Sequence, residues 1–266
     1  MDAVQDDETV DKLIGTWSVI QLRRGHRFST DDLVTAWRAW QAVPDAATVL
    51  DLGCGIGSVG LSTLYYLPPT TTLIGVEAQE VSVGLARRTV ALNGLTGRVT
   101  IVQGDLRDPA VLAADARFPL ITGSPPYLPA GTGLLSANSQ RAHARIELRG
   151  SVFDYCAAAA RHLAPGGRFC FVMLADDPRT EAAPAAAGLV VVERWEYVFG
   201  RGRRPHVATL VCAHAGEVTG PRATGRLVIR GPDGEWTPEY QAFRREMGIV
   251  VRRETPGEPP GGAAAD

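Results

Sequence analysis

A glycine-rich run at residues 51–60 (DLGCGIGSVG) is the first segment whose residue types point to chemistry. Glycines let a ligand approach the backbone closely, and a helix that begins after them offers free N–H groups. The G-x-G-x-x-G spacing that begins at Gly55 fits the dinucleotide fingerprint, but that fingerprint needs a strand running directly into its first glycine, and residues 51–54 intervene. The Asp-x-Gly-x-Gly-x-Gly spacing therefore favours a site for S-adenosylmethionine (SAM), whose ammonium and sulfonium groups suit a carboxylate at Asp51.

Two more carboxylates follow predicted strands. Glu77 comes directly after the strand Thr72–Val76, and Asp105 comes shortly after Val99–Gln103. We expect Glu77 to accept hydrogen bonds from ribose hydroxyls and Asp105 to accept one from an adenine amino group. Taken alone, each acid is better explained as a helix cap or a solvated loop residue. Acids at three successive strand ends instead indicate a ligand site, because open α/β folds bind ligands at that edge of the sheet.

A second candidate segment follows the predicted strand Phe118–Thr122. It is the run Ser124-Pro125-Pro126-Tyr127. Two successive prolines fix a rigid, extended backbone that exposes carbonyl oxygens. At the fourth strand end of a SAM-binding fold, this run would hold the Tyr127 ring beside the cofactor.

The elements that must position these residues alternate between strand and helix from Thr48 onward. We expect strands at 48–52, 72–76, 99–103, 118–122 and 168–174, and helices at 57–66, 80–93, 109–114 and 152–163. This alternation predicts an α/β fold with a parallel sheet covered on both faces. The β-rich segments 189–199 and 206–214 are predicted to pair antiparallel, because the six-residue connection between them is too short for a crossover helix.

Shorter elements are expected at both ends. The segments Leu13–Ile20 and Asp31–Ala42 are predicted to be helical, with Ser29 or Thr30 capping the second. A strand at 226–230 and a helix from Thr237 are predicted near the other end. The predicted division is a helical cap segment (1–45), a SAM-binding core (46–215), a strand–helix appendage (216–253) and a disordered tail (254–266).

Composition excludes several classes of protein. With 45% hydrophobic and 21% charged residues, the bulk of the 266-residue chain is not intrinsically disordered. The longest apolar run, 169–175, is far shorter than the ~20 residues that span a bilayer. The acidic start, Met1–Asp11, argues against a secretory signal. The four cysteines are scattered, so we expect reduced, packed thiols, no metal site and a cytoplasmic location.

The whole pattern resembles the class I methyltransferases that carry an Asn/Asp-Pro-Pro-Tyr motif and methylate amino or amide nitrogens. More closely, it resembles the bacterial tRNA(Val) adenine-N6-methyltransferase family. The segments that carry the resemblance are 25–31 (GHRFSTD), 51–60 with Glu77, 91–95 (ALNGL), 104–106 (GDL), 125–127 (PPY), 163–167 (LAPGG) and 227–239 (LVIRGPDGEWTPE). The resemblance implies a Rossmann-like class I fold with a mostly parallel seven-stranded sheet and a C-terminal antiparallel hairpin. It also implies SAM as cofactor and adenine N6 in tRNA as acceptor.

The resemblance also implies a set of site residues. Those implied for catalysis are Ser124, Pro125, Pro126 and Tyr127. Those implied for the cofactor are Phe28, Ser29, Asp31, Asp51, Gly53, Gly55, Gly57, Glu77, Asp105, Leu106 and Ser124. In such enzymes the motif's Asn side chain and the first proline's carbonyl accept the N–H groups of the target nitrogen, and the Tyr ring stacks on the base.

Ser124 departs from the family, which has asparagine at this position. Serine has a single oxygen that both donates and accepts, on a shorter side chain. Ser-Pro-Pro-Tyr occurs in methyltransferases that resemble the cytosine-N4 group, so the chemistry is retained while adenine specificity is open. The alternatives are a small-molecule or protein-glutamine N-methyltransferase, and a SAM-binding module without catalysis.

Basic residues gather in three places near the predicted site. They are Arg23, Arg24, His26 and Arg27; Arg141, Arg145 and Arg149; and Arg201, Arg203 and Arg204. The net charge is −2, so any RNA contact must use a local patch rather than a broad basic face. The alternative is ordinary solvated arginine, some of it paired with Glu147 or Glu196.

Overall fold

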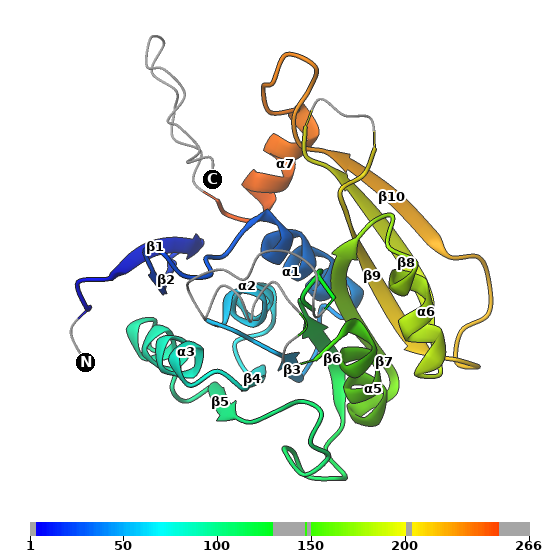
Figure 1. Cartoon of the computed structure of the whole chain (residues 1–266), viewed down its shortest axis with the longest axis horizontal. Coiled ribbons are helices and arrows are strands. Elements are labelled where there is room, and N and C mark those ends of the chain that lie inside the picture. The colour runs from blue at the N-terminus through cyan, green and yellow to red at the C-terminus, as the bar shows by residue number, and fades with distance from the viewer. Residues whose placement is uncertain (1–3, 130–146, 148–149, 201–203, 250–266) are drawn as a thin grey trace.

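The computed structural model describes residues 4–129, 147, 150–200 and 204–249, and these form a three-layer α/β sandwich (Figure 1). The central sheet of the described chain has eight strands in the order β10-β8-β9-β7-β6-β3-β4-β5. They are β3 (Thr48–Leu52), β4 (Thr72–Glu77), β5 (Val99–Gln103), β6 (Phe118–Gly123), β7 (Leu163–Leu174), β8 (Leu189–Val198), β9 (Val207–His214) and β10 (Ala223–Val228).

Strand direction confirms the predicted topology. β9 lies antiparallel between β7 and β8, and the remaining pairs in the sheet are parallel. The predicted hairpin is therefore β8–β9, and β8 ends on the same edge as β6. The expected strand number was wrong by one, because β10 adds an eighth strand parallel to β8.

Helices cover both faces of the sheet because strand residues alternate in direction. On β3, Val49 packs into one apolar cluster, whereas Leu50 and Leu52 pack into the other. The first cluster contains residues of α1 (Thr30–Ala42), α2 (Ser58–Tyr66), α3 (Glu80–Leu92) and α7 (Pro238–Glu246). The second contains residues of α5 (Val152–His162) and α6 (Arg179–Ala186). The four cysteines are free and buried, as expected.

The N-terminal segment is a β-hairpin, so the predicted helix at 13–20 was wrong. β1 (Glu8–Ile14) and β2 (Trp17–Leu22) pair antiparallel around a turn at Gly15, whose φ is +50°. The backbone N–H groups of Ser18 and Ile20 donate to the side chains of Asn93, the C-cap of α3, and of Thr89 within it, at 2.9 and 3.0 Å. These partners lie about 70 residues away, so a local pattern could not reveal them.

Two further local expectations changed. The predicted helix at 109–114 is a series of turns, since so short a segment cannot form enough helical hydrogen bonds to be stable. α6 was not predicted, because Pro184 interrupts its helical pattern. The other predicted helices and strands of the core are present, with ends shifted by a few residues and β7 longer at its start.

The C-terminal elements return to the first helix. Thr237 caps α7 by accepting from the Tyr240 N–H at 3.1 Å, as predicted, and the preceding strand ends at 228 rather than 230. The Phe243 ring packs edge-on against Trp37 of α1 at 5.1 Å. The predicted tail, 254–266, and the last residues of the appendage lie outside the described residues, and the division into segments stays a prediction.

Candidate active site

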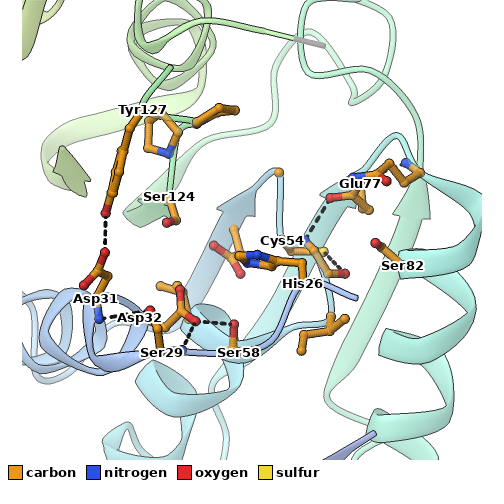
Figure 2. Close-up of a pocket in the computed structure, with 18 of the residues that line it drawn as sticks. His26, Ser29, Asp31, Asp32, Cys54, Ser58, Glu77, Ser82, Ser124 and Tyr127 are labelled. Atoms are coloured by element: carbon orange, nitrogen blue, oxygen red, sulfur yellow. Dashed lines mark hydrogen bonds between the residues drawn. The ribbon is translucent and has the colours of Figure 1, made fainter. Parts of the chain in front are cut away.

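A cavity of about 950 Å³ opens at the carboxyl ends of β3, β4 and β6 (Figure 2). Its size is in the range that holds small-molecule ligands and cofactors. The sequence-predicted residues that line it are Ser29, Asp31, Asp51, Gly53, Gly55, Glu77, Leu106, Ser124, Pro125, Pro126 and Tyr127. The sheet thus brings together segments that are up to 100 residues apart in the chain.

The glycine-rich turn is shaped by its neighbours. Gly53 has φ +58°, and a Cβ there would lie 1.9 Å from the Tyr155 hydroxyl of α5. Gly60, in α2, lies so close to Asp51 that a Cβ would come within 2.7 Å of its Oδ2. At Gly55, by contrast, a Cβ would meet nothing within 4 Å. Side chains therefore pack closely against the turn at Gly53 and Gly60, whereas the space beside Gly55 is open to a ligand.

Asp51 holds this turn together. Its Oδ2 accepts from the Gly60 N–H at 2.9 Å, and its Oδ1 accepts from the Thr122 hydroxyl at 2.7 Å. The carboxylate thereby joins β3, α2 and β6. Burial raises the pKa of Asp51 to about 6. Asp51 was predicted to bind the ligand, and the structure adds this organising role.

Glu77 supports the same turn from β4. Its two oxygens accept from the Gly55 N–H at 2.8 Å and from the Gln79 N–H at 2.7 Å (Figure 2). The side chain lines the cavity, as expected of a residue that receives hydroxyl groups. Its ribose role stays a prediction.

Three predicted site residues do not line the cavity. Asp105 forms an ion pair with Arg107 at 2.6 Å, although its neighbours Gly104 and Leu106 face the cavity. Phe28 packs against the apolar cluster of α1–α3, and Gly57 is the N-cap of α2. The resemblance to the methyltransferase family implied all three as cofactor-binding residues, but only their neighbours line the cavity.

The Ser-Pro-Pro-Tyr loop forms one wall, and α1 faces it. The Tyr127 hydroxyl donates to Asp31 Oδ2 at 2.7 Å, from the loop after β6 to the first turn of α1 (Figure 2). Ser124 is half-buried between this pair and the glycine-rich turn (Figure 2). Burial raises the pKa of Asp31 and that of Tyr127. The pair fixes the position of the Tyr127 ring at its outer end.

Asp32 also lines the cavity and was not predicted as a site residue. It accepts from the Ser29 N–H at 3.0 Å and from the Ser58 hydroxyl at 3.2 Å, in the capping box of α1. Burial raises the pKa of Asp32 to about 7. In sequence it reads as an ordinary capping residue. The signal available in the sequence was the pair of adjacent acids, since Asp31 was already a predicted site residue and both acids line the cavity.

The far wall comes from β8 and β9. Phe199 and His206 line the cavity, with their rings edge-on at 5.6 Å. Neither was predicted to line the cavity, although the arginines of the turn between them were predicted to lie near the site. Ser82 of α3 also lines the cavity, near Glu77 (Figure 2).

The basic residues are placed only in part. Arg23, Arg24, His26 and Arg27 all line the cavity, and Arg27 also pairs with Asp11 at 3.0 Å. Arg204 is exposed, three residues before β9 begins. The remaining predicted arginines, Arg141, Arg145, Arg149, Arg201 and Arg203, lie outside the described residues. Among described partners, Glu147 pairs with Arg179, and Glu196 pairs with Arg194 and Arg226.

The charge of the cavity fits a cationic ligand. Asp32 and Asp51 are buried carboxyl groups on its lining and Asp31 is a half-buried one, and burial disfavours their ionised forms. A ligand with ammonium and sulfonium groups would stabilise the ionised carboxylates. The residues present therefore fit SAM. In the described residues, no cluster of His, Cys, Asp and Glu could hold a metal ion.

Comparison with known proteins agrees with this geometry. Residues 28–186 match the methyltransferase small domain family. A tRNA1(Val) (adenine(37)-N6)-methyltransferase of Citrobacter koseri is 29% identical over 214 residues, covering 80% of this chain and 85% of that protein. A release factor glutamine methyltransferase of Geobacter sulfurreducens is 36% identical over 99 residues, covering 37% of this chain and 33% of that protein.

The fold has a counterpart among solved structures. The crystal structure of a predicted O-methyltransferase from Agrobacterium tumefaciens superposes with a TM-score of 0.55 at 17% identity. The match covers 84% of this chain and all of that one. It supports the Rossmann-like fold alone, since identity is so low.

Proposed function

The chain belongs to the methyltransferase small domain family of SAM-dependent enzymes, and on that premise we propose that its acceptor is the N6 amino group of an adenine in tRNA. Relatives named tRNA1(Val) (adenine(37)-N6)-methyltransferase match over about four-fifths of the chain, in Citrobacter koseri and other bacteria. One structural observation carries the proposal: the Ser-Pro-Pro-Tyr loop forms a cavity wall, and the Tyr127 ring is held there by Asp31.

We propose direct methyl transfer without a covalent enzyme intermediate. SAM, when bound, supplies an electrophilic methyl group. Asp51 and Glu77 keep the glycine-rich turn open to it, and the carboxylates of the lining balance its positive charge. The Ser124 hydroxyl and the Pro125 carbonyl would accept the N–H groups of the target nitrogen, so that its lone pair is turned toward the methyl group. The C–N bond would form as the bond between the methyl carbon and the sulfonium sulfur breaks, and the methylated nitrogen would lose one proton to solvent. Positioning of this kind contributes on the order of 7–11 kcal/mol to lowering a barrier.

Tyr127 would stack on the acceptor base. Its hydroxyl is occupied by Asp31, so the ring presents its face rather than a polar edge. An adenine offers a flat surface for such stacking, worth about 1–3 kcal/mol.

The arginines that line the cavity would contact the RNA. The side chains of Arg23 and Arg24 are exposed there and would bind the RNA backbone. The enzyme would act in the cytoplasm. In the described residues, no helix has the length and apolar character needed to cross a bilayer.

A glutamine side chain in a protein is the second candidate acceptor. One observation favours it: 99 residues are similar to a release factor glutamine methyltransferase. That similarity covers about a third of either protein, so we rank it below tRNA.

Nucleoside mass spectrometry of purified tRNA tests the proposal. We expect N6-methyladenosine to disappear from one tRNA when the gene is deleted. It should return with the wild-type gene but not with Tyr127→Ala. An unchanged tRNA profile would reject adenine N6 and direct attention to protein glutamine, with Ser124 as the reason.

A further inference from the structure

Arg179, the first residue of α6, reaches across to the loop that carries Tyr127. Its guanidinium donates to the Tyr127 carbonyl oxygen at 2.9 Å and forms ion pairs with Asp177 at 2.6 Å and Glu147 at 2.5 Å. The Glu147 N–H in turn donates to the Leu128 carbonyl at 2.9 Å. Arg179 does not line the cavity, so it has no direct contact with a ligand there.

The Ser-Pro-Pro-Tyr loop needs such a donor. Proline has no N–H, so Pro125 and Pro126 cannot anchor the backbone by donating hydrogen bonds. The loop must instead be held through side chains and carbonyl oxygens. Tyr127 shows both: its hydroxyl is bound to Asp31 on one face of the sheet, and its carbonyl is bound to Arg179 from the other. The ring is thus fixed at both ends.

The guanidinium suits this position better than a single donor would. Its planar guanidinium donates hydrogen bonds to two carboxylates and one carbonyl oxygen at the same time, and the ion pairs hold it in place. The Arg179 side chain is about one-fifth exposed, so these bonds are partly shielded from water. The contacts link the β7–α6 connection to the loop after β6.

We propose that Arg179 is a positioning residue for methyl transfer, which sets the height and tilt of the Tyr127 ring through the carbonyl of Tyr127. This inference rests on the proposed function, in which the Tyr127 ring receives the acceptor base. Loss of Arg179 would lower turnover and leave cofactor affinity unchanged, because the cavity lining keeps its residues.

Arg194 provides a matched control. It also pairs with two carboxylates, Glu181 and Glu196, at 3.0 and 3.4 Å, and donates to a backbone carbonyl, that of Ala175, at 2.7 Å. Its side chain is similarly buried. The difference is that Ala175 is not part of the Ser-Pro-Pro-Tyr loop. Arg179→Gln and Arg194→Gln therefore lose comparable bonds in different places.

The experiment measures SAM affinity by calorimetry, turnover at saturating SAM and tRNA, and hydrogen exchange at the Glu147 amide, which donates to the Leu128 carbonyl. In Arg179→Gln we expect unchanged SAM affinity, turnover lower by about 10- to 100-fold, and faster exchange at this amide, because Glu147 loses its ion pair. In Arg194→Gln we expect wild-type values for all three. Equal turnover in the two variants, or unchanged exchange in Arg179→Gln, would overturn the proposal.

The outcomes separate this inference from the proposed function. If the wild-type enzyme leaves tRNA adenine unmodified, the proposed acceptor is wrong, and hydrogen exchange with SAM affinity still tests whether Arg179 holds the loop. If the wild type is active and Arg179→Gln matches it, the acceptor stands and the positioning role falls.

Discussion

The stability of the cofactor-free protein should depend on pH through Asp32. Its pKa is raised from 3.8 to about 7 because the carboxyl group is buried between the first turn of α1 and the start of α2. An acid with a raised pKa in the folded state holds its proton there and loses it on unfolding. The stabilisation that the protonated Asp32 carboxyl group gives the folded state is therefore fully present below pH 4. It falls as the pH rises above 4, and it is lost once the pH has risen through 7.

The expected magnitude follows from these two pKa values. Between pH 5 and pH 7, Asp32 alone would lower the free energy of unfolding by about 2 kcal/mol. Asp51, whose pKa is raised to about 6, acts in the same direction over a lower range. Asp32→Asn keeps the size of the side chain and an acceptor for the Ser29 N–H, but removes the ionisation.

Urea denaturation at pH 5 and pH 7 tests this expectation. The wild type should be more stable at pH 5, and Asp32→Asn should reduce the difference by about 2 kcal/mol. Asp11→Asn is the control: hydrogen bonds from Gln21 and Thr9, with the nearby Arg27, lower the pKa of Asp11, so it is ionised in both states across this range. An identical pH dependence in the wild type and Asp32→Asn would refute the assignment of a buried, protonated Asp32.

Three further predictions concern the site. Tyr127→Ala should retain SAM affinity by calorimetry and lose turnover by about 100-fold, whereas full activity would refute the stacking role. Gly60→Ala should destabilise the protein by about 1–3 kcal/mol, because the new Cβ displaces the Asp51 carboxylate. Gly84→Ala, at an exposed helix position with nothing within 4 Å, should instead stabilise it by up to about 1 kcal/mol, and thermal denaturation of both variants measures the two effects. Asp51→Ala should abolish SAM binding in calorimetry, and wild-type affinity would show that the turn forms without it.

The fold was predictable where sequence signals are local. The alternation of strands and helices from Thr48, the turn after it and the Thr237 cap all depend on neighbouring residues. The N-terminal hairpin was not predictable in this way, because backbone N–H groups of β2 donate to the side chains of Asn93 and Thr89, about 70 residues further along the chain. The position of β10 depends likewise on pairing with β8 rather than on its own composition.

The site was predictable as a set of segments more than as a set of contacts. Motifs located the glycine-rich turn, Glu77 and the Ser-Pro-Pro-Tyr loop. They gave no indication that Asp51 would bind Gly60 and Thr122, or that Tyr127 would bind Asp31. Those bonds arise between elements that only the folded sheet brings together.

The pairing of β10 with β8 has a consequence for behaviour in solution. Without β10, the sheet would end at β8, a ten-residue strand with an open row of backbone donors and acceptors. Such an edge is a template for pairing with another chain. β10 covers residues 193–198 of it with a shorter strand that carries Arg226, and Gly225 leaves room for the Trp195 ring, which a Cβ would approach within 2.3 Å. The appended strand thus replaces a ten-residue edge with a six-residue one that carries a charged side chain, two features that oppose edge-to-edge pairing with another chain.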